Sequence, residues 1–226
     1  SQAQLAEGIY DLRLKAPEIA SQAAAGQFVS VYSKDGSRLL PRPISLCGID
    51  KEAGQLRLVY RVAGAGTEEF SALKAGDTVD ILGPLGNGFS LLEGKKAFLI
   101  GGGIGIPPML QLAKELCALN GSEMVQSVIG YRDSQLFLKD EFEAYGPVYT
   151  ATEDGSRGTK GNVLNAIREN GLTADVIYAC GPTAMLRALK AYAAENNIQC
   201  WISLEEKMAC GVGACLACVC QSKEKD

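Results

Sequence analysis

Histidine is absent from the 226 residues of this chain. Its absence excludes a Ser-His-Asp triad, a histidine-ligated zinc ion and an iron–sulfur cluster of the Rieske type. Proton transfer near neutral pH must therefore use another residue type. A chemistry carried mainly by bound cofactors suits such a chain, because the protein then supplies binding, orientation and electrostatics.

Long hydrophobic runs and basic stripes are also missing. No apolar stretch approaches the roughly 20 residues needed to span a bilayer, and no secretion signal is seen at the N-terminus. The formal net charge is −4, without a cluster of Lys and Arg to bind nucleic acid or anionic lipid. We therefore expect a cytoplasmic protein that binds neither nucleic acid nor membrane.

The 8 cysteines are distributed unevenly. Four are scattered, whereas Cys210, Cys215, Cys218 and Cys220 lie close together near the end of the chain. A secreted disulfide scaffold would spread its cysteines through a smaller protein. The cluster instead indicates metal binding in a reducing compartment.

Residues 1–94 have the pattern of a β domain. Residues 27–32 and 56–62 alternate apolar and polar side chains, as half-buried strands do, and 77–82 is a further short strand. Glycine-rich turn signals separate these segments. Many short strands at this spacing predict a small antiparallel β-barrel.

Residues 95–203 change to alternating strands and helices. We expect strands at 97–100, 124–129, 148–151, 175–180 and 198–203, and helices at 107–120, 162–170 and 182–196. Such alternation predicts a parallel sheet with helices on both faces. Residues 204–226 then form a short cysteine-rich lobe apart from both domains.

A glycine run follows the first strand of the second domain and opens a helix. Without side chains, Gly102, Gly103 and Gly105 let a pyrophosphate approach backbone N–H groups at the positive end of the helix dipole. The spacing is not a full G-x-G-x-x-G, because position 108 is proline. A strand-to-helix turn without a ligand is the alternative.

Two short elements of the first domain also suit phosphate. The segment 42–45 (RPIS) places an arginine beside a rigid proline and a serine hydroxyl, an arrangement that can clamp a phosphate. The segment 64–67 (GAGT) can present N–H groups and a hydroxyl to a second phosphate. A surface arginine and an ordinary barrel turn are the alternatives.

The cysteine spacing is the most specific signal. Cys210-x4-Cys215-x2-Cys218 is the plant-type spacing for three ligands of a [2Fe–2S] cluster. Zinc is the main rival, but zinc sites usually combine two C-x2-C pairs, and one pair is visible here. Free thiols are a third possibility. Cys220 stands one residue beyond Cys218 and is an awkward ligand for the same iron.

Together these elements resemble the ferredoxin-reductase superfamily over nearly the whole chain. Residues 205–220 (EEKMACGVGACLACVC) narrow the resemblance to the electron-transfer subunits of NAD-dependent (class 1B) dihydroorotate dehydrogenases. The resemblance implies that FAD is bound by Arg42, Pro43, Ile44, Ser45, Gly64, Gly66 and Thr67. It implies that the nicotinamide nucleotide is bound by Gly102, Gly103, Gly105, Cys180, Gly181 and Pro182.

The resemblance also implies a reaction and a partner. A separate catalytic subunit oxidises dihydroorotate to orotate at FMN, and electrons then pass through the [2Fe–2S] cluster and FAD to NAD⁺, in pyrimidine biosynthesis. The assembly is a heterotetramer of two catalytic and two electron-transfer subunits. The family's ligands match Cys210, Cys215 and Cys218, and the fourth lies further on, past residue 226, so we expect a truncated sequence. Cys220 as fourth ligand, or a form without the cluster, is the alternative.

Two residue assignments stay open. Cys180 ends a strand beside the expected nicotinamide, where we expect a positioning role; a buried structural thiol is the alternative. Arg132 can accept a 2′-phosphate, whereas Asp133 favours a free ribose hydroxyl, so NAD rests on the resemblance.

Two rival functions remain. One is a subunit of another flavin and iron–sulfur NAD(P)H oxidoreductase, of the ferredoxin:NADP or sulfide dehydrogenase type. The other is a non-catalytic redox-sensing or zinc-binding module with the same fold, in which NADH would not reduce a flavin.

Overall fold

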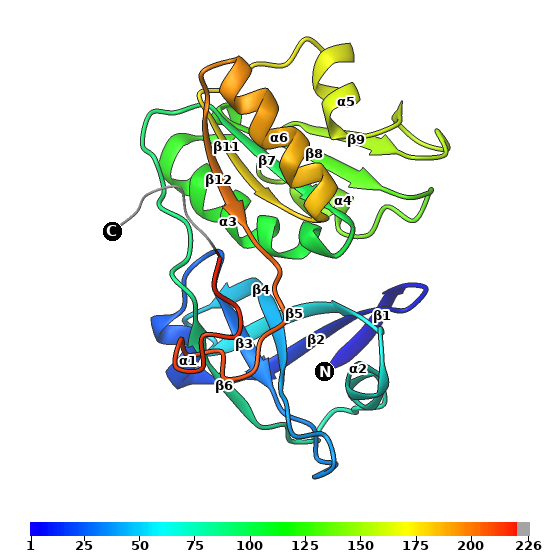
Figure 1. Ribbon diagram of the computed structural model, residues 1–226, viewed down its shortest axis with the longest axis vertical. Helices are drawn as coiled ribbons and strands as arrows, with labels where there is room; N and C mark the ends of the chain where they lie inside the picture. The colour runs from blue at the N-terminus through cyan, green and yellow to red at the C-terminus, as the bar shows by residue number, and fades with distance from the viewer. Residues whose placement is uncertain (221–226) are drawn as a thin grey trace.

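The computed structural model describes residues 1–220 and contains two domains, one above the other in Figure 1. The last six residues of the predicted 204–226 lobe lie outside the described residues. Within the described part, no helix is both long and apolar enough to cross a membrane.

The N-terminal domain is an antiparallel sheet with the strand order β1-β2-β5-β4-β3-β6. Its strands are β1 (Gln2–Ala6), β2 (Ile9–Lys15), β3 (Phe28–Val31), β4 (Arg42–Asp50), β5 (Gln55–Arg61) and β6 (Ile81–Leu85). Two short helices, α1 (Pro17–Gln22) and α2 (Ala65–Ser71), accompany them. Every second side chain along a strand points to the same face. Leu46 of β4 and Leu58 of β5 are paired across the two strands, and both are fully buried in the core of this domain.

The C-terminal domain is a parallel sheet with the order β10-β9-β8-β7-β11-β12. Its strands are β7 (Ala97–Gly102), β8 (Val125–Tyr131), β9 (Val148–Thr152), β10 (Thr159–Lys160), β11 (Val176–Cys180) and β12 (Gln199–Ser203). Its helices are α3 (Ile106–Asn120), α4 (Lys139–Phe142), α5 (Val163–Glu169) and α6 (Thr183–Glu195), and short 3-10 turns span Gly103–Gly105 and Ser122–Met124.

Helices cover both faces of this sheet, as predicted. Leu99 packs into one core with α3 and α4, whereas its neighbours Phe98 and Ile100 pack into the other with α5 and α6. Successive side chains of a strand point to opposite faces, so β7 serves both cores. The predicted fold class is confirmed.

Most of the predicted helices and strands are found, but the strand expected at 77–82 is placed several residues too early. Helix α3 ends before Gly121, whose φ of 88° closes the helix with an N–H bond to the Cys117 carbonyl. The strand expected at 77–82 begins only at Ile81. Asp77 instead closes a turn with Lys74, since its N–H bonds the Lys74 carbonyl and its carboxylate accepts the Lys74 N–H.

The C-terminal segment returns from one domain to the other. After β12 it runs down to the N-terminal sheet beside β3 and β6 (Figure 1). A Cβ placed on Gly211 would lie 3.0 Å from Ser30 Oγ and 3.2 Å from Leu85 Cδ1, so this loop packs directly on those strands. The topology therefore brings the cysteine cluster to the first domain.

Candidate flavin, nucleotide and cluster sites

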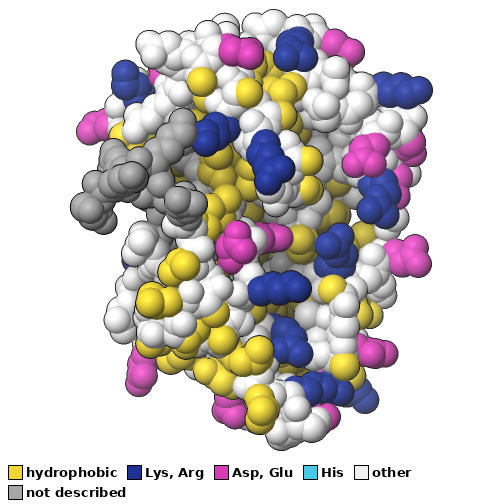
Figure 2. Space-filling view, in the orientation of Figure 1, with side chains coloured by type: hydrophobic (Ala, Val, Ile, Leu, Met, Phe, Trp, Pro, Cys, Tyr) yellow, Lys and Arg dark blue, Asp and Glu magenta, His cyan; other side chains and the backbone are white. Residues whose placement is uncertain are grey.

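A cavity of about 610 Å³, here called the flavin pocket, opens between the N-terminal sheet and the segment after β12. All four residues of the 42–45 segment line it, together with Thr67. The face in view in Figure 2 is hollowed between the domains, with apolar side chains in the hollow and charged ones around it. A mostly apolar cleft with a few polar groups is typical of a cofactor site.

Arg42 and Gly66 are fitted to each other at the start of α2. A Cβ on Gly66 would lie 2.7 Å from Arg42 Nε and 2.9 Å from its Nη2, so glycine makes room for the guanidinium. No carboxylate of the residues that the structure describes pairs with Arg42; its Nη1 donates to the Leu40 carbonyl. This guanidinium beside helix N–H groups suits a bound pyrophosphate.

Thr67 and Gly64 have a local structural role. The Thr67 hydroxyl accepts the N–H of Ala63 at 2.9 Å and donates to the Gly64 carbonyl at 2.9 Å. These bonds hold the first turn of α2 in place. The segment 64–67 is thus a helix start, with Thr67 in the lining of the flavin pocket, whereas Gly64 is exposed and is not among the lining residues.

The flavin pocket is also lined by residues that the sequence analysis did not predict, among them Tyr60, Arg61, Trp201 and Glu205. The Trp201 indole Nε1 is buried and has no hydrogen-bond partner among residues 1–220. A buried donor without a partner is costly, so this N–H suits an acceptor on a bound group. Tyr60 and Arg61 end β5, Trp201 lies in the middle of β12 and Glu205 follows that strand, so only the tertiary fold brings these residues together.

A second cavity of about 510 Å³, the nucleotide pocket, lies at the carboxyl ends of the parallel strands. It contains Gly102, Gly103 and Pro182 from the predicted set, and Met185. The N-terminal domain contributes Ala6, Glu7, Ile9 and Arg61, so the pocket is built from both domains. Crevices at this end of an open parallel sheet are the usual ligand sites of α/β folds.

Gly105, Cys180 and Gly181 lie behind the nucleotide pocket rather than in its lining. A Cβ on Gly105 would lie 2.4 Å from the carbonyl carbon and oxygen of Cys180. Gly105 is therefore required for the glycine loop to pack against the end of β11, and Gly181 has a φ of 155° just beyond it.

Cys180 is 1% exposed. Burial, and after it the negative charge of Glu205, raise the pKa of Cys180 to about 12. The side chain is therefore a neutral thiol at neutral pH, which does not suit a nucleophile.

The ends of β8 and β9 supply charge to the nucleotide pocket. Arg132 and Asp133 both line it, and Glu153 adds a second carboxylate that the sequence had not indicated. A carboxylate in this region suits a free ribose hydroxyl and disfavours a 2′-phosphate.

Cys210, Cys215 and Cys218 lie on one loop, and Gly211 and Gly213 have φ angles of 70° and 78° that bend it. The Cys215 N–H lies 3.4 Å from Cys210 Sγ, and this contact, followed by others from the loop backbone, lowers the pKa of Cys210 to about 6. Such N–H groups favour thiolate, the form that ligates iron. Within residues 1–220, no three cysteine or carboxylate side chains converge on a common ion position.

Two dinucleotide-sized pockets on an antiparallel β domain and a parallel α/β domain define a flavin- and nicotinamide-dependent oxidoreductase of the ferredoxin-reductase type. Family comparisons agree. The chain matches the oxidoreductase FAD-binding domain over residues 5–89 and the oxidoreductase NAD-binding domain over 99–191. It matches the iron-sulfur cluster binding domain of dihydroorotate dehydrogenase B over 205–226.

Individual relatives narrow the class. The chain is 45% identical over 222 residues to the dihydroorotate dehydrogenase B (NAD(+)) electron transfer subunit of Geobacillus sp. (strain WCH70), covering 96% of this chain and 85% of that protein. The subunit of the same name from Bacillus caldolyticus is 47% identical over 227 residues, covering 97% and 86%. The chain belongs to this family of electron transfer subunits, and the prediction that it binds FAD, NAD and an iron–sulfur cluster is confirmed.

Solved structures share the fold. A structure of an NADH-dependent reduced ferredoxin-NADP oxidoreductase superposes with a TM-score of 0.87 at 32% identity, covering 96% of this chain and 79% of that chain. The Amycolatopsis cytochrome P450 reductase GcoB superposes with a TM-score of 0.73 at 24% identity, covering 90% and 67%. The second similarity concerns the fold alone.

Proposed function

We propose that the chain passes electrons from a catalytic subunit of dihydroorotate dehydrogenase B to NAD⁺, through a [2Fe–2S] cluster and FAD. The observation that supports this order is the continuity of the three sites. Arg61 and Ile104 line both the flavin and the nucleotide pocket. Leu204 and Met208 line the flavin pocket and lead along the chain to Cys210.

FAD, when bound, exchanges a hydride with nicotinamide and single electrons with a cluster, so it joins two-electron to one-electron chemistry. The chain's own residues bind and orient the groups. In this proposal Arg42 and the start of α2 hold the flavin pyrophosphate, and the Trp201 N–H donates to the flavin. Gly102 and Gly103 admit the nucleotide pyrophosphate, while buried Cys180 supports the nicotinamide end of the pocket.

The proposal also assigns a residue range to each cofactor and names a partner subunit. Residues 1–94 bind FAD, residues 95–203 bind NAD, and residues 204–226 bind the cluster through Cys210, Cys215 and Cys218, with the fourth ligand from beyond Cys220. The partner is an FMN-containing catalytic subunit in a two-plus-two heterotetramer. A cysteine cluster that binds metal fits a reducing compartment, which supports a cytoplasmic location.

An anaerobic visible spectrum with iron and acid-labile sulfide analysis, before and after NADH, tests this proposal. We expect flavin and iron–sulfur absorbance that NADH bleaches, and dihydroorotate-dependent reduction of NAD⁺ only when the catalytic subunit is added. Bleaching by NADH without dihydroorotate activity in that complex would favour a different flavin and iron–sulfur oxidoreductase. Absence of flavin from the protein would refute the proposal.

A further inference from the structure

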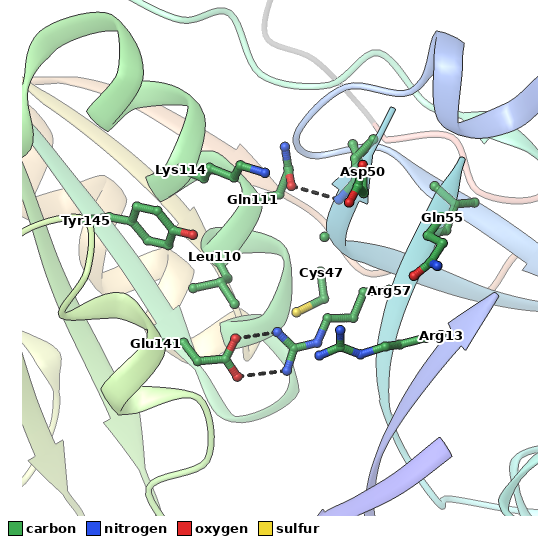
Figure 3. Close-up of a pocket in the computed structure, with 13 residues that line it drawn as sticks. Arg13, Cys47, Asp50, Gln55, Arg57, Leu110, Gln111, Lys114, Glu141 and Tyr145 are labelled. Carbon is green, nitrogen blue, oxygen red and sulfur yellow. Dashed lines mark hydrogen bonds and ion pairs between the residues drawn. The ribbon is translucent and has the colours of Figure 1, made fainter. Parts of the chain in front are cut away.

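A third cavity, of about 260 Å³, lies at the domain interface and belongs to neither pocket. Figure 3 shows it between the strands β4 and β5 of one domain and the helices α3 and α4 of the other. Its central charge is Arg57, which reaches from β5 toward Glu141 of α4 (Figure 3). We call Arg57, Asp11 and Glu141 the interdomain clamp.

One guanidinium serves two carboxylates, one from each domain. Arg57 Nε donates to Asp11 Oδ1 at 3.0 Å, and its Nη2 lies 3.0 Å from Asp11 Oδ2. Arg57 Nη2 also donates to Glu141 Oε1 at 2.8 Å, while Nη1 bonds Glu141 Oε2. Such paired contacts use the planar fork of arginine and are stronger and more directional than single ones.

The N-terminal domain prepares Arg57 for this contact. The Arg57 and Asp11 side chains are 13% and 7% exposed, so their pairing is shielded from water. Gly48 lies opposite on β4, where a Cβ would come within 3.2 Å of Arg57 Cβ. The Glu141 side chain is 46% exposed, and hydrogen bonds from Arg57 lower its pKa. Removing Glu141 would therefore leave Arg57 paired with Asp11.

The clamp holds a segment that lines the nucleotide pocket. Arg132, Asp133, Gln135 and Phe137 line that pocket, and Glu141 follows them on the same segment. The segment has a second tie to the N-terminal domain, because Glu7 N–H donates to Gln135 Oε1 at 3.0 Å. Residues 132–141 are thus fixed to the other domain at two points.

Two regular elements connect the clamp region with the pockets. Arg57 and Arg61 both lie on strand β5, about 13 Å apart at about 3.3 Å per residue, and Arg61 lines both pockets. Helix α3 begins at the glycine loop, and its Gln111 accepts the Ile49 N–H at 2.8 Å across the interface. Because β5 and α3 are stiff, a change in domain orientation at the clamp would also displace Arg61 and the glycine loop, which line the nucleotide pocket.

We propose that Arg57 and Glu141 are positioning residues for the nicotinamide nucleotide: their pairing fixes residues 132–141 and the domain orientation, and so shapes a nucleotide pocket that takes its walls from both domains. The proposal rests on the proposed function, in that NAD is the ligand of this pocket. Neither Arg57 nor Glu141 lines the nucleotide pocket.

The test compares Glu141→Ala with Asp140→Ala in the FAD-loaded chain. Both changes remove a carboxylate from α4, but Asp140 is 94% exposed and lies 3.7 Å from Lys139. We expect the dissociation constant for NAD⁺, measured by calorimetry, to rise about three- to fivefold in Glu141→Ala, as for a half-exposed ion pair. Hydrogen exchange should quicken in residues 132–141 of Glu141→Ala alone, with flavin content unchanged.

Equal NAD⁺ affinity and equal exchange in the two variants would overturn the proposal. If the Glu141→Ala protein loses its flavin or unfolds at a much lower temperature than the parent protein, NAD⁺ binding is measured in Glu141→Gln instead. This variant keeps the side chain's size and loses its charge, so weakened NAD⁺ binding supports the proposal and parental binding overturns it. Failure of the parent chain to bind NAD⁺ would refute the proposed function itself, while exchange in 132–141 still reports whether the clamp holds this segment.

Discussion

Replacing Gly105 by alanine is expected to destabilise the C-terminal domain through one steric contact. The backbone of Gly105 has φ −80° and ψ −4°, outside the left-handed region, so alanine introduces no left-handed strain there. The new methyl carbon, however, would lie 2.4 Å from the carbonyl carbon and oxygen of Cys180 and 2.6 Å from Gly181 Cα. All of these atoms belong to the backbone, so no side chain can rotate away.

The cost follows from that geometry. An ordinary contact needs at least about 3.4 Å, so the glycine loop and the end of β11 must separate by about 1 Å. Overpacking of this kind costs about 1–3 kcal/mol, and a backbone neighbour places this case near 3 kcal/mol. For a chain of this size each kcal/mol lowers the midpoint of thermal unfolding by about 2–4 °C, so we expect a decrease of about 6–12 °C.

Calorimetry of the FAD-loaded chain measures the shift, and Gly36→Ala is the matched control. Gly36 is exposed, has no neighbour within 4 Å of its added Cβ, and is not in the left-handed region. Its midpoint should stay within about 1 °C of the parent, as for most surface substitutions. A Gly105→Ala midpoint equal to that of Gly36→Ala would show that the loop does not pack on β11 in this way.

Four further outcomes are expected. Gly66→Ala meets only a flexible guanidinium at 2.7 Å, so it should keep the fold and lower the flavin content, read from visible absorbance; full flavin would contradict the pyrophosphate assignment. Cys180 has a thiol pKa of about 12, so a thiol reagent at pH 8 should modify it only upon unfolding, as peptide mapping would reveal. The pKa of Glu141 is lowered in the fold, so its stabilising effect is present above the ordinary value near 4.5 and lost as pH falls through the lowered value. The difference in unfolding midpoint between the parent and Glu141→Gln should therefore be constant from pH 8 to pH 6 and shrink below about pH 4.5. Cys215→Ser should abolish the iron–sulfur absorbance and retain FAD, whereas Cys220→Ser should retain both; loss of the cluster in the second variant would make Cys220 a ligand.

Structural features whose signals lie in consecutive residues could be predicted from the sequence. Helix α3 follows a glycine run, carries proline in its first turn and stops at Gly121, and each of these signals is local. The alternation of strands and helices likewise predicted the parallel sheet with helices on both faces. The glycine loop and the 42–45 segment were identified because each contains its whole signal within a few residues.

Features built from distant residues could not be predicted in this way. Trp201 lies in the middle of β12, and its buried indole N–H, which has no partner among residues 1–220, is placed at the flavin pocket only by the tertiary fold. Arg57 and Glu141 are 84 residues apart, and an arginine in a strand and a glutamate in a short helix are each ordinary. The start of β6 was misplaced because the side chain of Asp77 favours a turn over the strand that the apolar pattern suggested.

Strand β5 shows how a chain whose chemistry resides in cofactors can still control a reaction. At one end Arg57 ties the two domains together, and at the other Tyr60 and Arg61 reach the flavin pocket, with Arg61 also at the nucleotide pocket. Transfer between bound groups depends steeply on their separation and alignment, and misplacement by about 1 Å can cost about 100-fold in rate. Cys180 is a neutral thiol at neutral pH, so it does not suit acid–base catalysis. In the proposed function the chain positions the bound groups, and the domain interface held by the shielded Arg57 guanidinium supports that geometry within one strand of both pockets.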